Sequence, residues 1–223
     1  MHTLKHGYTN RTVGDGAIVH KTYDGPDAAD RLKREQTLLR RLQGRVPVPP
    51  LLRAGERTLT LGFVPGVPGQ DLIDADHAEA VLQSCGKMLR RIHAASTDLL
   101  DDGAGNVDGV LVHGDFGPHN TLLDPQAFHV TAVVDWEFAH LGNPVEDLAW
   151  CEWIVRMHHH EHVDALSRFF RAYGGSVPSW PIRKAAMLAT CTSLKEFCYR
   201  RDPSSPSVRQ WEERAKITAG WQE

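Results

Sequence analysis

The sequence has few cysteines, no long apolar run and no excess of basic residues. Its four cysteines, at positions 85, 151, 191 and 198, show no CxxC spacing, so free thiols in a reducing compartment are expected. No apolar run approaches the roughly 20 residues that a membrane-spanning helix needs. The first residues also lack the apolar core of a signal peptide. We therefore expect a cytoplasmic protein that does not bind a membrane.

The charge balance excludes a further class of partner. Lysine and arginine together number 25 and aspartate and glutamate 28, which gives a formal net charge of -3. Such a chain lacks the basic footprint of a nucleic-acid-binding protein, so we expect no nucleic-acid partner. With 223 residues, 41% of them hydrophobic, the chain can bury a sizeable core, in one large domain or in two small lobes.

The residue pattern changes part-way along the chain. Before the change, alternating β-branched residues and periodic leucines predict strands at 17–23, 51–54 and 58–61 and a helix at 28–42. Prolines and glycines over 63–69 mark a boundary. After it we predict helices at 76–96, 145–173, 181–200 and 208–219, and short strands at 110–113, 121–123 and 130–135. The predicted fold class is α+β, with an antiparallel-sheet lobe at 1–64 and a mostly helical lobe at 65–223.

A loop between two predicted strands carries the most informative residues. Asp115 and Asn120 lie five residues apart on it, so a carboxylate and an amide can converge on one point. The pattern H-x-D-x-x-x-x-N, which begins at His113, matches the catalytic loop of kinases, where the Asp accepts a hydroxyl proton and the Asn binds magnesium. Asp135 ends the next apolar strand, and its hard oxygens suit Mg²⁺. We predict Asp115 as the catalytic base and Asn120 and Asp135 as Mg²⁺ ligands.

Phosphoryl transfer also needs positive charge on the phosphates of the donor. Lys21, at the end of a predicted strand, can supply that charge, and Glu35 on the following helix can hold it in an ion pair. The turn at Gly7, Thr9 and Asn10 is where a phosphate-covering hairpin is expected, with backbone amides close to the phosphates. These residues predict a site for ATP or GTP.

In order, these motifs resemble those of the aminoglycoside phosphotransferase and choline kinase family of small-molecule kinases. The resemblance covers residues 7 to 149 and rests on segments 7–10, 19–21, 34–39, 61–66, 89–93, 113–123, 133–137 and 142–149. The combination of H-G-D-x-x-x-x-N-x-L-L, D-W-E and G-x-P-x-x-D-L-A is highly specific. Gly114 stands where protein kinases have arginine, which favours the small-molecule members.

The resemblance implies a bilobal protein-kinase-like fold and transfer of the γ-phosphoryl group to a hydroxyl of a small molecule. It implies that the backbone of Gly62, Phe63 and Val64 binds adenine, and that His113 and Asp147 brace the catalytic loop. The acceptor is expected between that loop and the C-terminal helices. An amino-sugar antibiotic is the first acceptor class. Choline-like amino alcohols, other sugars and other antibiotics are the alternatives.

Several features leave alternatives open. Asn143 replaces the usual Asp of the family's G-D-P turn, and the segment after Ala149 matches no named subfamily, so the acceptor and oligomeric state are not implied. A silent nucleotide-binding module is one rival. A protein kinase is another, but the chain lacks an A-P-E segment. The histidines at 158–162 suggest a metal-dependent hydrolase, without HExxH spacing, and a polar helix surface is the preferred interpretation.

Four further residues lie in or next to these motifs and have expected roles of their own. We predict Trp136 and Trp150 to be core residues and His119 to be an ordinary loop residue, although it lies close enough in sequence to touch phosphate. Glu137 follows Asp135 in the D-W-E motif. It is predicted as a carboxylate that either binds the metal directly or supports the residues that do, with neither option favoured.

Overall fold

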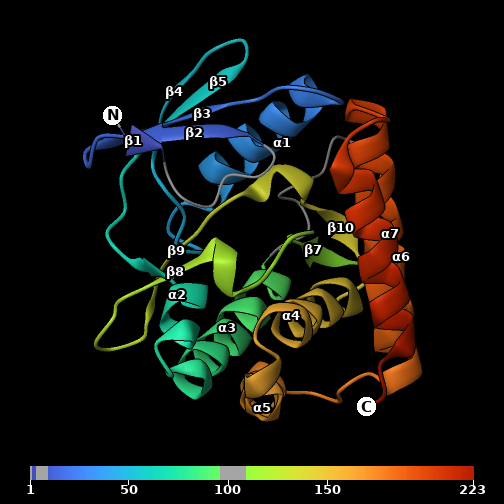
Figure 1. Ribbon diagram of the computed structural model, residues 1–223. Helices are drawn as coiled ribbons and strands as arrows, with labels where there is room; N and C mark the ends of the chain where they lie inside the picture. The colour runs from blue at the N-terminus through green and yellow to red at the C-terminus, as the bar shows by residue number, and fades with distance from the viewer. Residues whose placement is uncertain (1, 4–9, 96–108) are drawn as a thin grey trace.

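Five antiparallel strands and one helix form the smaller of two lobes (Figure 1). The computed structural model describes residues 2, 3, 10–95 and 109–223. The strand order in the small lobe is β1 (His2–Thr3), β2 (Arg11–Gly14), β3 (Ile18–Thr22), β5 (Thr58–Gly62) and β4 (Leu51–Ala54). Every neighbouring pair is antiparallel. The three strands predicted for this region are confirmed, and β3 lies at the centre of the sheet.

Helix α1 (Ala28–Arg41) packs against this sheet through one face. Leu32, Leu38 and Leu39 on that face are buried, at the spacing that predicted the helix. The same face buries two charged residues, Arg31 and Glu35. Because a buried charge without a partner is costly, such residues are normally paired. Both are paired: Glu35 with Lys21 of the neighbouring strand β3, and Arg31 with Glu137 of the larger lobe, as described below.

The larger lobe is mostly helical and contains two small sheets. Its helices are α2 (Gly69–Asp74), α3 (Ala78–His93), α4 (Val145–His158), α5 (Leu166–Tyr173), α6 (Trp180–Arg201) and α7 (Pro206–Gly220). One sheet has the order β6 (Val67–Pro68), β8 (Thr121–Leu123) and β9 (Val130–Val133), and the other pairs β7 (Val110–Val112) with β10 (His140–Gly142). Short 3₁₀ turns are η2 (Pro118–Asn120), η3 (Trp136–Phe138) and η4 (His160–Ala165). Among the described residues, no helix is long and apolar enough to cross a membrane.

The single helix predicted over 145–173 is wrong, because the chain forms two helices there. The backbone leaves α-helical geometry at His159 (φ −137°, ψ 49°) and continues as the 3₁₀ turn η4 before α5 begins. The His159 side chain is buried and its Nδ1 lies 3.1 Å from Asp74 of α2. A contact with another helix therefore fixes the break, and the apolar pattern of the segment gives no sign of it.

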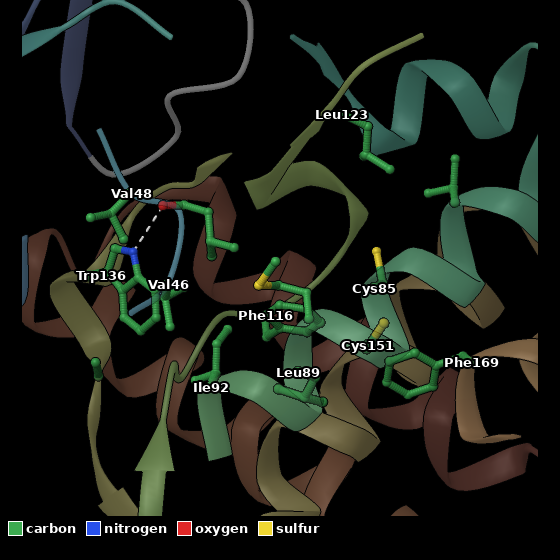
Figure 2. Close-up of a cluster of buried hydrophobic side chains, with 14 of the residues drawn as sticks. Val46, Val48, Cys85, Leu89, Ile92, Phe116, Leu123, Trp136, Cys151 and Phe169 are labelled. Atoms are coloured by element: carbon green, nitrogen blue, oxygen red, sulfur yellow. Dashed lines mark hydrogen bonds between the residues drawn. The ribbon is translucent and has the colours of Figure 1, made fainter. Parts of the chain in front are cut away.

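A hydrophobic core lies directly beneath the loop that follows β7 (Figure 2). Phe116 points down from that loop and is buried among Leu89 and Ile92 of α3 and Cys151 of α4. Trp136 is also buried, and its Nε1 donates a 3.0 Å hydrogen bond to the carbonyl of Val133. The predicted core role of Trp136 is confirmed. Burial of Phe116 fixes the loop on which Asp115 lies.

The lobes are also joined away from the connector at 63–66. Helices α6 and α7 run side by side along one edge of the molecule, and one end of α6 reaches the small lobe (Figure 1). Arg200 of α6 forms a 2.8 Å ion pair with Asp27, just before α1. Phe197 lies under the guanidinium of Arg31, 5.3 Å from ring centroid to Cζ. The end of α6 therefore holds α1 against the large lobe.

Candidate active site

The loop from His113 to Asn120 is braced from below by one carboxylate. Asp147, near the start of α4, accepts hydrogen bonds from the backbone N–H of His113 (2.7 Å) and of Gly114 (3.0 Å). Its Oδ2 also lies 3.1 Å from Nε2 of His93. The His113 Nε2 donates to the carbonyl of Val134 at 3.0 Å, and burial lowers the pKa of this imidazole, which keeps it neutral. His113 and Asp147 thus make the bracing contacts that the resemblance implied.

Gly114 is a position in this loop where a side chain would be both strained and too close to the backbone of Phe138. Its φ of +81° lies in the left-handed region, where an L residue with a Cβ is strained. A Cβ added there would lie 2.5 Å from the carbonyl oxygen of Phe138. Because Gly114 has no side chain, the loop can lie directly against η3, and Asp115 is held close to the residues that follow Asp135.

Two hydrogen-bond donors and one imidazole surround the carboxylate of Asp115. Trp150 donates from Nε1 to Oδ1 at 2.7 Å, and the Nε2 of His119 lies 3.3 Å from the same oxygen. Asn120 donates from Nδ2 to Oδ2 at 3.0 Å and to the Asp115 carbonyl at 2.9 Å. Neither Trp150 nor His119 was predicted to contact Asp115.

The surroundings of Asp115 favour its charged form. Burial alone would raise the pKa of this carboxyl, but the nearby imidazole of His119 and the hydrogen bonds from His119 and Trp150 outweigh it and hold the pKa below the usual value. Conversely, burial opposes a charge on His119, but the Asp115 carboxylate raises its pKa above the usual value. The two residues form a charged pair over the pH range between their two pKa values.

This pair predicts a pH-dependent stability. Because folding raises the pKa of His119, its charge stabilises the fold fully at pH values below 6.5, the ordinary pKa of histidine. This stabilisation is lost as the pH rises through the pKa of His119 in the folded state. His119→Gln is therefore expected to lower the free energy of unfolding by about 1 kcal/mol near pH 6 and by much less near pH 9. Urea denaturation at both pH values measures the difference. An equal loss at both would contradict a charged pair.

Lys21 is buried between two carboxylates, those of Glu35 and Asp135. Its Nζ lies 2.5 Å from Oε2 of Glu35, and it also forms an ion pair with Oδ1 of Asp135. Tyr23 donates a 2.6 Å hydrogen bond to the same Glu35 oxygen. Burial opposes the charge on Lys21, but Asp135 and Glu35 raise its pKa well above the usual value, so it is a cation at every physiological pH. The predicted contact between Lys21 and Glu35 is present.

Glu137 belongs to a second buried network that joins the lobes. Its carboxylate accepts hydrogen bonds from Asn10 Nδ2, 2.8 Å to each oxygen, and from Arg31 at 2.5 Å. The carboxylates of Glu35, Asp135 and Glu137 approach within 4.8 Å of one another. The side chain of Asn10 is therefore engaged with Glu137, and a phosphate contact there would have to come from its backbone. Gly7 and Thr9 lie outside the described residues.

A cleft of about 380 Å³ lies between the lobes. Polar groups line one part of it, and apolar side chains line the rest, among them Val19, Leu61, Leu122 and Val134. Gly62, Phe63 and Val64 also border the cleft. The N–H of Gly62 donates to Pro50 and that of Phe63 to Ala17, and among the described residues the N–H of Val64 has no backbone partner. Val64 is thus the one residue of this segment whose N–H can serve a ligand.

Comparison with known proteins places the chain in a family. The sequence profile described as "Phosphotransferase enzyme family" matches residues 2–108 and 97–186. The chain belongs to this family. The resemblance drawn from the motifs is confirmed, and this phosphotransferase-family member is related to small-molecule kinases.

Solved structures share the fold. The macrolide 2'-phosphotransferase MphH of Brachybacterium faecium is 19% identical and aligns over 100% of this chain and 93% of its own, with a TM-score of 0.62. An APH(2") enzyme with GDP and kanamycin is 15% identical over 98% and 92%, with a TM-score of 0.75. The aminoglycoside phosphotransferase APH(4)-Ia is 20% identical over 99% and 94%, with a TM-score of 0.69. The predicted bilobal α+β kinase-like fold is confirmed.

Curated relatives match a short segment only. Acyl-CoA dehydrogenase family member 11 of Homo sapiens is 46% identical over 39 residues, and member 10 of Mus musculus is 48% identical over 40 residues. The matches cover 18% of this chain and 5% and 4% of those proteins. The chain therefore matches only a small part of the length of these relatives.

The donor set of this phosphotransferase-family member fits a divalent metal. Asn120 uses its amide nitrogen to bond Asp115, and within the described ranges its Oδ1 has no hydrogen-bond partner. Asp135 lines the same cleft. Hard oxygens of an amide and a carboxylate are the ligands that Mg²⁺ takes together with phosphates and water. Asn120 and Asp135 are therefore the residues that would hold Mg²⁺, whereas Glu137 is already bonded to Arg31 and Asn10.

The histidine-rich segment does not assemble a metal site. In the part of the chain that the structure describes, the one cluster of three possible metal ligands is Glu35, Asp135 and Glu137. His158 packs its edge against the Trp153 ring at 5.7 Å, and burial together with Arg214 lowers its pKa to about 4. His159 contacts Asp74, and His160 is largely exposed. The hydrolase interpretation thus has no structural support in these residues.

Proposed function

We propose that this chain transfers the γ-phosphoryl group of ATP or GTP to a hydroxyl of a small molecule. The observation that carries the proposal is one cluster: Lys21, Asn120 and Asp135 line the cleft, and Asp115 is hydrogen-bonded to Asn120 at its edge. We assign residues 1–64 to the nucleotide-binding lobe and 65–223 to the lobe that carries the catalytic loop and the acceptor site. The four reduced cysteines favour the cytoplasm.

The proposed nucleotide position follows from the polarity of the cleft. The apolar side chains of Val19, Leu61 and Leu122 suit the flat faces of a purine, and the N–H of Val64 suits its acceptor edge. Lys21 then lies where the phosphates end and can exchange its contact with Asp135 for a phosphate oxygen. Complexes of related folds with GDP or ADP support a nucleotide in this position.

In the proposed reaction Asp115 accepts the proton of the acceptor hydroxyl. The hydroxyl oxygen forms a bond to the γ-phosphorus while the bond from that phosphorus to the β,γ-bridging oxygen breaks, and the nucleoside diphosphate leaves. Lys21 neutralises phosphate charge, and Glu35 keeps its ammonium in place. Magnesium, when bound by Asn120 and Asp135, would supply further charge neutralisation on the phosphates.

A second hollow, of about 500 Å³, borders the other side of the catalytic loop and suits the acceptor. Gly114, which precedes Asp115 in the chain, and Trp150, which donates a hydrogen bond to Asp115, both line it. The opposite wall is one face of α6, with Ala189, Ser193 and Phe197. Its position supports entry of the acceptor between the catalytic loop and the C-terminal helices.

The charges of this hollow are mixed and do not select one acceptor class. Two of its carboxylates, Asp27 and Glu146, are paired with basic side chains, whereas Asp30 lines the hollow without an ion pair among the described residues. Arg31 lines it too, but its guanidinium is paired with the buried carboxylate of Glu137. An amino-sugar antibiotic, which related structures bind, therefore stays the first acceptor class, and choline-like amino alcohols and sugars stay the alternatives.

The test is Mg²⁺-dependent release of ADP or GDP against an acceptor panel. The panel holds kanamycin, hygromycin B, erythromycin, choline, simple sugars and, because of the curated relatives, a hydroxyacyl-CoA. Turnover of one compound supports the proposal. Nucleotide binding without turnover of any compound would favour a silent nucleotide-binding module, and absence of nucleotide binding would overturn the proposal.

Lys21→Met is expected to impair use of the nucleotide. Removal of the ammonium leaves the phosphates without their protein cation, so kcat/KM for ATP or GTP is expected to fall by about 10²- to 10³-fold. Initial rates at varied nucleotide concentration measure it. Lys87→Met, on the exposed side of α3, is the control and is expected to match the unmodified protein. An Lys21→Met variant with unchanged kcat/KM would exclude Lys21 from the site.

A further inference from the structure

The hydrogen bond between Trp150 and Asp115 has no counterpart in the sequence motifs. Trp150 lies on α4, almost fully buried, and its Nε1 is 2.7 Å from Oδ1 of Asp115. Its ring stacks on Trp153, with the centroids 4.4 Å apart and the planes 9° apart, and Trp211 of α7 lies 6.1 Å away. Packing on these rings fixes the indole, so its N–H has one direction.

Trp150 differs from the other two groups around Asp115. The attraction of His119 depends on its protonation, and the amide of Asn120 belongs to a proposed metal ligand. The indole N–H of Trp150 carries its proton at every accessible pH and has no acceptor capacity. It therefore gives Asp115 a permanent donor whose position does not depend on pH or on a bound ligand.

The two oxygens of Asp115 are unequally occupied. Oδ1 accepts a hydrogen bond from Trp150 and also lies 3.3 Å from the imidazole of His119, whereas among the described residues Oδ2 accepts from Asn120 only. Two rings therefore cover Oδ1, and since a carboxylate oxygen can accept about two hydrogen bonds, Oδ2 keeps capacity for a ligand. A proton from an incoming hydroxyl can then be taken by Oδ2.

We propose that Trp150 is the positioning residue of the catalytic carboxylate, because its indole N–H holds Oδ1 of Asp115 and leaves Oδ2 to accept the proton of the acceptor hydroxyl. The inference rests on the proposed phosphotransfer. In the step, the O–H bond of the acceptor breaks, its proton moves to Oδ2, and the freed oxygen bonds to the γ-phosphorus as the nucleoside diphosphate leaves.

The neighbouring tryptophan on the same helix is a matched control. Trp153 is buried in the same stack, and its Nε1 donates to Oγ1 of Thr218 on α7 at 2.8 Å. Trp150→Phe and Trp153→Phe therefore each keep an aromatic ring and each remove one indole donor from the same cluster. They differ in which acceptor is left without its donor, Asp115 or Thr218.

The kinetic test compares these two variants with the unmodified protein. Trp150→Phe is expected to lower kcat by roughly 10- to 100-fold with little change in the KM for nucleotide. It is also expected to raise the pH of the acidic limb of the kcat profile by about one unit, since Asp115 loses a hydrogen bond to its charged form. Trp153→Phe is expected to change neither quantity. Equal effects of the two substitutions on kcat and on the pH profile would overturn the proposal.

A second measurement does not require turnover. Among the indole N–H signals of the six tryptophans in a ¹⁵N-labelled sample, the one absent in Trp150→Phe is expected to change its chemical shift in Asp115→Asn, because the acceptor of its hydrogen bond loses its charge. The signal absent in Trp153→Phe should keep its chemical shift in Asp115→Asn. A Trp150 signal at the same position in Asp115→Asn and in the unmodified protein would overturn the proposal. Failure of the proposed function would instead appear as no turnover in the unmodified protein.

Discussion

Replacing Asp115 with asparagine is expected to lower kcat by about 10³-fold while nucleotide affinity changes little. Asparagine keeps the shape of the side chain, and its Oδ1 can still accept the hydrogen bond from Trp150. It lacks the second oxygen that takes the acceptor proton. Nucleotide affinity is preserved because Asp115 is absent from the lining of the nucleotide cleft. Initial rates with the acceptor found in the panel, together with calorimetric titration of ADP, measure the two quantities.

A half-buried aspartate outside the site serves as the control for this substitution. Asp124, in the turn after β8, accepts hydrogen bonds from the backbone N–H groups of Gln126 and Ala127 and lines neither the cleft nor the second hollow. Asp124→Asn is expected to leave kcat within twofold, roughly the scatter of neutral surface changes. If Asp115→Asn kept more than a tenth of the activity, Asp115 would not be the base and the reaction would need another proton acceptor.

The largest effect on stability is expected from Arg31→Met. Arg31 is 2% exposed, and its guanidinium bonds Glu137, Asn10 and the backbone carbonyls of Asp24 and Pro26. Glu137 is 0% exposed, so the substitution leaves a buried carboxylate without its cation. Loss of one partner from such a pair typically costs 3–5 kcal/mol, and we expect the free energy of unfolding to fall by about 4 kcal/mol. Urea denaturation at neutral pH measures it.

An exposed ion pair of the same lobe provides the comparison. Arg57 pairs with Asp24, and these side chains are 60% and 51% exposed. Water screens such a pair, so Arg57→Met is expected to cost less than about 1 kcal/mol. A similar cost for Arg31→Met and Arg57→Met would mean that the buried network contributes no more than a surface contact.

Contacts between two motif residues could be predicted from the sequence because the motif specifies the residue type and the position of both. Spacing and residue type placed Lys21 against Glu35, and Asp115 beside Asn120, and both contacts are present. The strands and helices around them were predictable because alternating or helical burial leaves a pattern in the sequence. Short pieces such as α2, β6 and β10 were missed, since two to six residues are too few to show a period.

The sequence does not predict polar contacts made by core residues or by residues far apart in the chain. Trp150 has the helical spacing of a core residue and is one, and only the geometry of the loop shows that its N–H reaches Asp115. Asn10 and Glu137 are 127 positions apart, and neither residue type signals the other. Contacts of this kind arise from the packing of elements onto one another, which a single sequence does not encode in any local pattern.

Three carboxylates within 4.8 Å of one another would repel strongly in an empty active site. Here Lys21 lies against Glu35 and Asp135, and Arg31 against Glu137, so each negative charge has a built-in counter-ion before any ligand arrives. The free energy needed to bring like charges together is thus offset during folding. In the proposed function, binding a nucleotide then requires Lys21 and Asp135 to exchange partners: Lys21 would turn from Asp135 to a phosphate, and Asp135 from Lys21 to Mg²⁺.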